Sequence, residues 1–123
     1  MARKITTDDG RAALAAVDDA AAAGAQPARA DLGTAVRYLL QLLAEKAPGT
    51  SVEVRVPPFG AVQVVEGPRH TRGTPPNVVE ITPAMWISLA TGASSWADAV
   101  GTPDLGASGI RASEIAALLP LRP

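Results

Sequence analysis

The 123-residue chain contains no cysteine, one histidine and only four aromatic side chains, and these shortages exclude several kinds of chemistry. Without cysteine there is no disulfide, no thiol nucleophile and no cysteine-ligated metal. The net charge of −1 lacks the basic field typical of nucleic-acid binding, so no nucleic-acid partner is expected. No apolar run approaches the roughly 20 residues that a membrane-spanning helix needs.

The hydrophobic content of 47% overstates the size of the core, because 25 of these residues are alanine. Alanine buries little apolar area, so the core is adequate rather than large. A large ligand cavity would forfeit packing contacts that a single small domain needs. Any ligand pocket is therefore expected to be modest, or to rely on its lipid to fill it.

Residues 1–30 form an Ala-rich helical extension followed by a linker. A helix is predicted over residues 8–24, begun by Thr7 or Asp8 and stopped by Gly24. Its few large apolar residues favour a packing arm or a dimer contact. Aspartates interrupt the apolar stretch, which argues against a signal peptide, and a cytoplasmic location is the default expectation.

Residues 31–123 form the remaining domain, which opens with an amphipathic helix capped by Asp31 and ended by Pro48-Gly49. Its apolar residues recur at spacings of three and four, which places them on one face. The period then changes to two at Val52, Val54 and Val56, as in a half-buried strand. The turn at residues 57–60 leads into a second strand over residues 61–66, and the two strands are predicted to form a hairpin.

A third strand is predicted at Asn77–Ile81, and Thr82-Pro83 then begins a helix that Gly92 ends. Ser95 caps a second, short helix through Val100. A strand at residues 105–110 and a closing helix at residues 113–119 complete the order of an α+β fold.

Several of these segments together carry a family pattern. The strand NVVEIT runs into Pro83-Ala84-Met85-Trp86 and Leu89-Ala90-Thr91-Gly92, and a helix around Trp96-Ala97-Asp98 precedes the last strand and helix. The central hairpin and the loop PRHTRGTPPN complete it. Over roughly residues 31–121 the chain resembles the sterol-carrier-protein family, in particular its small actinobacterial (bacterial orthologue) branch.

The resemblance implies a mixed, mainly antiparallel sheet of four to five strands covered by helices on one face. Four strands are evident, and a fifth is expected within residues 67–74. An apolar tunnel between sheet and helices would accept sterols, fatty acyl chains or phospholipids. Carried over to this chain, the tunnel residues are Met85, Trp86, Leu89, Trp96, Leu118 and Leu119 on the helices and Val62, Val64, Val79 and Ile81 on the sheet.

The loop over residues 67–73 concentrates Arg69, His70 and Arg72 among glycine and proline. Two guanidiniums and nearby backbone N–H groups can bind an anion, such as a lipid headgroup or a carboxylate. The plainer interpretation is a solvated loop whose arginines pair with Glu66 or Glu80.

His70 is the only side chain that would titrate near neutral pH without a shifted pKa. The chain has no serine in a nucleophile-elbow motif and no carboxylates spaced to bind a metal together with His70. We therefore expect no catalytic residues, no metal, no cofactor and no enzymatic activity.

Two functions remain open. The first is a non-enzymatic intracellular carrier of an apolar or amphipathic small molecule, a lipid, fatty acid or acyl conjugate, whose anionic end the Arg69–Arg72 loop can hold. The second is a ligand-free interaction module with a filled core, which contacts an acidic protein through that loop. Trp86 and Trp96 fit both readings, as pocket walls or as core residues. The ligand and the oligomeric state stay open.

Overall fold

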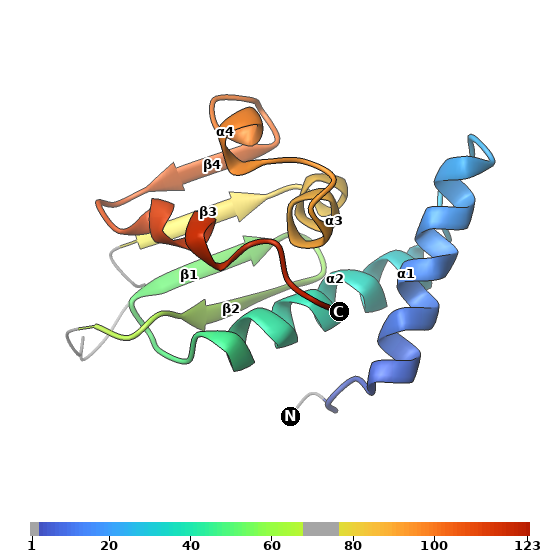
Figure 1. Ribbon diagram of the computed structural model, residues 1–123, viewed down its shortest axis with the longest axis horizontal. Coiled ribbons are helices and arrows are strands. Elements are labelled where there is room, and N and C mark those ends of the chain that lie inside the picture. Colours follow the sequence, from blue (N-terminus) through green and yellow to red (C-terminus); the bar gives the residue numbers. More distant parts are fainter. Residues whose placement is uncertain (1–2, 68–76) are drawn as a thin grey trace.

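The computed structural model describes residues 3–67 and 77–123 (Figure 1). In chain order its elements are the helices α1 (Thr7–Ala22) and α2 (Arg29–Lys46), the strands β1 (Val52–Val56), β2 (Gly60–Val64) and β3 (Asn77–Ile81), the helices α3 (Pro83–Thr91) and α4 (Trp96–Ala99), the strand β4 (Leu105–Ser108) and the 3₁₀ helix η1 (Ala112–Leu118). This order confirms the α+β fold.

The described strands form one mixed sheet in the order β2-β1-β3-β4. The two outer pairings, β1 with β2 and β3 with β4, are antiparallel, and the central pairing of β1 with β3 is parallel. A mixed, mainly antiparallel sheet of four strands is therefore confirmed. The fifth strand expected within residues 67–74 falls, apart from Gly67, outside the described residues.

One face of the sheet supplies the core. Along β1, the residues Val52, Val54 and Val56 are buried and alternate with partly exposed Glu53 and Arg55, as the period of two predicts. The covering residues come from α2, α3 and η1, which lie on the buried side of the sheet (Figure 1). The opposite face carries Val78 among polar and small side chains, and the ion pair between Glu53 and Arg55 lies on it.

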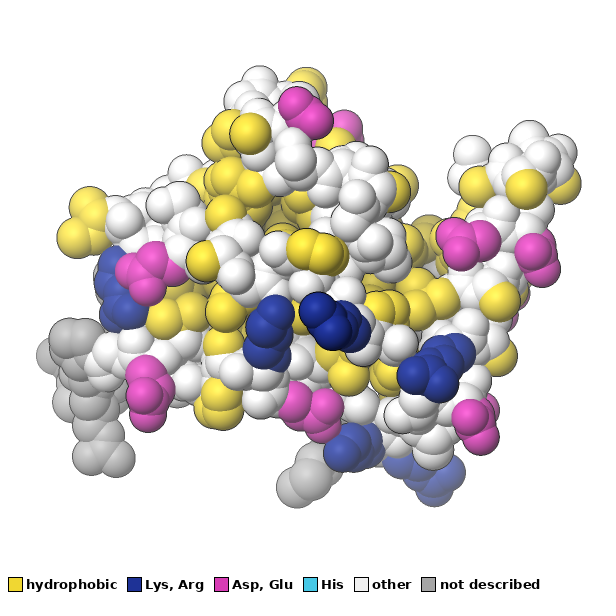
Figure 2. Space-filling view, viewed as in Figure 1, with side chains coloured by type: hydrophobic (Ala, Val, Ile, Leu, Met, Phe, Trp, Pro, Cys, Tyr) yellow, Lys and Arg dark blue, Asp and Glu magenta, His cyan; other side chains and the backbone are white. Residues whose placement is uncertain are grey.

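The first two helices form an antiparallel pair, and α1 packs on α2 rather than on the sheet. Gly10 makes this contact close: a Cβ added there would lie 2.3 Å from Cγ of the Tyr38 ring. In the space-filling view α1 projects from one side of the molecule, and hydrophobic side chains show in the hollow between it and α3 (Figure 2).

Both predicted helix caps in this pair are wrong by a few residues. Thr6, and not Thr7 or Asp8, begins α1, because the Thr6 hydroxyl accepts a hydrogen bond from the Asp9 N–H at 3.1 Å. The cap of α2 is Ala28, which places Asp31 inside the first turn. A carboxylate there still interacts favourably with the positive end of the helix dipole.

The second half of the chain follows the predicted order with one change of helix type. Thr82 precedes α3, but its hydroxyl lies 3.2 Å from Oδ1 of Asp104 instead of capping the helix. Gly92 ends α3 with φ +87°, and the Ser95 hydroxyl caps α4, both as predicted. The closing helix is a 3₁₀ helix, which suits a short segment stopped by Pro120.

Candidate functional site

The residues assigned to a tunnel by resemblance divide into two groups. The first group is buried in the core and consists of Val64, Val79, Ile81, Trp86 and Leu89, each at most 2% exposed. The second group is partly buried at the core's edge and consists of Val62, Met85, Trp96, Leu118 and Leu119.

Trp86 lies where α3 crosses α2. Its side chain is 0% exposed, and its indole N–H donates to the Val36 carbonyl oxygen of α2 at 3.2 Å. A satisfied donor inside a packed core makes this indole a structural residue that joins the two helices.

Leu89, Trp96 and Leu119 do converge on one cavity. It lies between α3, α4 and η1 and has a volume of about 340 Å³. Ala116 and Pro120 add further apolar surface, and Ser94 and Ser95 place hydroxyls at the same cavity. We call this cavity the helical pocket; it is an apolar space with a polar edge.

The predicted anion-binding residues Arg69, His70 and Arg72 lie outside the described residues, but the base of their loop is described. Asn77 is 4% exposed and donates through Nδ2 to the Ser51 carbonyl oxygen at 2.9 Å. Its Oδ1 accepts a hydrogen bond from the backbone N–H of Arg111 at 3.0 Å. The Arg111 side chain in turn donates to the Glu66 carbonyl oxygen at 2.9 Å. Both ends of the loop are thereby tied to the start of η1.

Arg111 also pairs with Glu114, one turn further along η1. Its Nε lies 2.7 Å from Oε2 of Glu114, and Nη2 lies 3.1 Å from Oε1. This hydrogen bonding raises the pKa of the guanidinium and lowers the pKa of the Glu114 carboxyl below its ordinary value. The pair helps to hold the Arg111 side chain beside the loop base.

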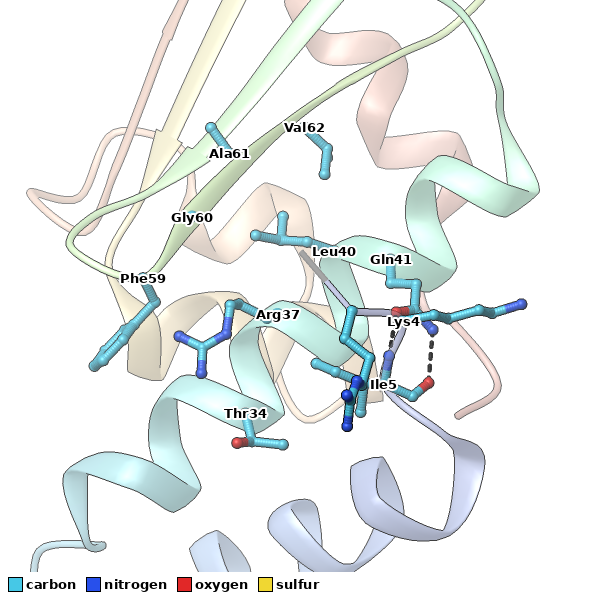
Figure 3. A pocket seen from close by; sticks show the side chains of 11 residues that line it. Lys4, Ile5, Thr34, Arg37, Leu40, Gln41, Phe59, Gly60, Ala61 and Val62 are labelled. Atoms are coloured by element: carbon cyan, nitrogen blue, oxygen red, sulfur yellow. Dashed lines mark hydrogen bonds between the residues drawn. The ribbon is translucent and has the colours of Figure 1, made fainter. Parts of the chain in front are cut away.

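A larger groove, which the sequence did not predict, lies outside the core. It has a volume of about 720 Å³ and is bounded by residues 3–5, the outer side of α2 and the edge strand β2 (Figure 3). Its lining includes Arg37 of α2. The missed signal is the pair Phe59-Gly60, an aromatic beside a residue without a side chain, in the turn that faces α2.

Within residues 3–67 and 77–123, no group of three or more histidine, aspartate or glutamate side chains is arranged to hold a metal ion. No helix in the same ranges is long and apolar enough to cross a membrane.

A model of the family described as bacterial SCP ortholog matches residues 28–121, which include every described element except α1. No curated protein matches the chain. The matched region contains the whole sheet and the helical pocket, whereas residues 3–5 of the groove lie before it. Because the match extends over most of its length, the chain belongs to the bacterial SCP (sterol-carrier-protein) ortholog family.

Proposed function

We propose that this protein is a non-enzymatic binding protein that carries an apolar or amphipathic small molecule, such as a fatty acyl chain or another lipid. The observation that carries the proposal is the convergence of Leu89, Trp96 and Leu119 on the helical pocket of about 340 Å³. That volume falls at the lower end of the roughly 300–1,000 Å³ usual for ligand sites. It agrees with the modest pocket expected for an alanine-rich core.

The affinity of the helical pocket would come from burial of apolar surface. Each methylene group of a ligand removed from water contributes roughly 0.8 kcal/mol. The half-buried Trp96 ring can close over such a chain, and the Ser94 and Ser95 hydroxyls offer hydrogen bonds to a polar end. A short apolar chain with one polar end fits this lining.

The Arg69–Arg72 loop is the proposed holder of an anionic end. Its base is tied to Arg111, and the helical pocket is lined by Ala116 further along η1. With a rise of about 2.0 Å per residue in a 3₁₀ helix, the anchoring residue and the pocket lie about 10 Å apart along η1. An amphipathic ligand is long enough to bridge that separation.

The test starts with native mass spectrometry of freshly purified protein, followed by identification of any molecule released on denaturation. It is paired with Ala116→Leu, which adds bulk inside the helical pocket, and Ala117→Leu, its exposed neighbour on η1 that does not line the pocket. Ala116→Leu should remove the molecule held in the helical pocket, so that one fewer ligand is bound per chain, and Ala117→Leu should retain it.

A wild-type protein that shows a clean apo mass, with no gain after incubation with fatty acids or phospholipids, would contradict the carrier proposal. The filled core around Trp86 would then favour the interaction module. The search would turn to acidic protein partners of the basic loop.

A further inference from the structure

We infer that the groove bounded by residues 3–5, α2 and β2 is a second binding site, and that it takes a long-chain carboxylate. The site is distinct from the helical pocket, which is built from α3, α4 and η1. The inference therefore does not depend on the function proposed for that pocket.

The groove has an apolar lining suited to a single chain. Leu40 of α2 is 2% exposed, and the partly buried side chains of Ile5, Phe59 and Val62 surround it (Figure 3). Gly60 lies close to the floor of the groove, since a Cβ added there would make an ordinary van der Waals contact of 3.5 Å with Cδ1 of Leu40. The resulting volume of about 720 Å³ accommodates a longer chain than the helical pocket does.

The charged groups that line the groove are all cations: Arg3, Lys4 and Arg37. Lys4 is paired with Glu45 at 3.1 Å, so its charge is largely compensated. Among the described residues neither Arg3 nor Arg37 forms an ion pair. An anionic ligand end is the complement of this lining, and a carboxylate matches the forked donors of a guanidinium.

Arg37 is positioned beside the aromatic end of the groove. A Cβ added at Gly33 would lie 3.0 Å from Cδ1 of Phe59 and 3.1 Å from Nη1 of Arg37, so the ring and the guanidinium meet above this glycine. The Arg29 guanidinium carbon lies 5.2 Å from the centroid of the same ring. A carboxylate near Phe59 would therefore meet Arg37 while its chain runs along Leu40 toward Ile5.

The far end of the groove is closed by the segment before α1. The Gln41 side chain holds the backbone of Ile5 through two hydrogen bonds of 2.9 Å, one from the Ile5 N–H to Oε1 and one from Nε2 to the Ile5 carbonyl oxygen (Figure 3). This wall precedes the region matched by the family model. Residues 3–5 thus add one wall of the groove to the family domain.

The test uses palmitate and hexadecanol, which share a chain length and differ in charge. Binding of each is measured by calorimetry for the full chain, for Arg37→Gln and for Arg55→Gln; Arg55 lies on the open face of the sheet and does not line the groove. Arg37→Gln should weaken palmitate binding about ten-fold, as expected for loss of a charge-assisted hydrogen bond. It should leave hexadecanol unchanged, and Arg55→Gln should affect neither.

Photo-crosslinking then locates the ligand. A diazirine derivative of palmitate should label residues 34–41 and 59–62, which line the groove. Labelling confined to residues 89–96 and 116–120 would overturn this inference and leave the helical pocket standing as the carrier site. Equal effects of Arg37→Gln and Arg55→Gln on palmitate, or no palmitate binding at all, would also overturn it.

Discussion

The indole N–H of Trp86 donates to the carbonyl oxygen of Val36, 50 positions earlier in the chain, at 3.2 Å. Both residues are 0% exposed, so this hydrogen bond ties α3 to α2 inside the core. Leu89 lies on α3 as well and lines the helical pocket. The packing of Trp86 therefore fixes the position of the helix that carries Leu89.

Trp86→Phe should lower the free energy of unfolding by about 1–3 kcal/mol, because it removes a buried hydrogen bond and leaves a small cavity. Urea unfolding followed by far-ultraviolet circular dichroism measures the change. Trp96→Phe, at a half-buried position, should cost clearly less. An equal loss of unfolding free energy for the two substitutions would contradict a special contribution of the buried Trp86 side chain to stability.

Gly10→Ala should destabilise the protein by about 1–3 kcal/mol, although alanine is ordinarily the better helix former. The reason is steric, since the added Cβ would collide with the Tyr38 ring at 2.3 Å. Thermal unfolding is the measurement. Gly106→Ala, where nothing lies within 4 Å of an added Cβ, is the control and should be close to neutral. A stabilised Gly10→Ala protein would contradict close packing of α1 on α2.

Asn77→Ala should cost about 1–3 kcal/mol of folding free energy. The substitution leaves the Ser51 carbonyl oxygen and the Arg111 N–H without their shared partner at a buried position. Gln63→Ala, on the exposed face of β2, should stay within about 0.5 kcal/mol of wild type. Chemical denaturation compares the two, and a similar small loss for both would remove Asn77 as the anchor of the loop base.

The ion pair between Arg111 and Glu114 should make stability depend on acid. Hydrogen bonding to Arg111 lowers the pKa of Glu114 in the folded state, so the pair contributes stability above the ordinary glutamate pKa of about 4.3. That contribution is lost as the pH falls through the lowered pKa. The Tm difference between wild type and Glu114→Gln should therefore be larger at about pH 6 than at about pH 3. A difference that is the same at both pH values would contradict the assignment.

Local patterns predicted the elements well where one physical signal dominated. The alternation at Val52, Val54 and Val56 and the strand Asn77–Ile81 appear in the structure as predicted, because a period of two has few competing explanations. Helix starts were less certain. Thr6 and Thr7 both carry a capping hydroxyl, and only backbone geometry decides between them.

The concave sites were harder to predict, because their walls come from distant parts of the chain. Leu89, Trp96 and Leu119 could be expected near one another only through the resemblance to a known family. The groove combines Ile5, Arg37 and Phe59, and each of these alone has an ordinary surface or core explanation. No periodicity relates them. The turn before β2 packs on α2 and brings Phe59 close to Arg37, and the docking of residues 3–5 on Gln41 adds Ile5.

Because β1 pairs in parallel with β3, the centre of the sheet cannot assemble from neighbours in sequence. The helix pair α1–α2 and the hairpin β1–β2 join segments that are close in sequence and can form early. The pairing of Val52 with Asn77 instead requires closure of the chain between them, which includes β2. The slow step of folding should therefore be the closure of this central pairing. Substitutions in β3 that weaken it would be expected to lengthen the folding time as well as to lower stability.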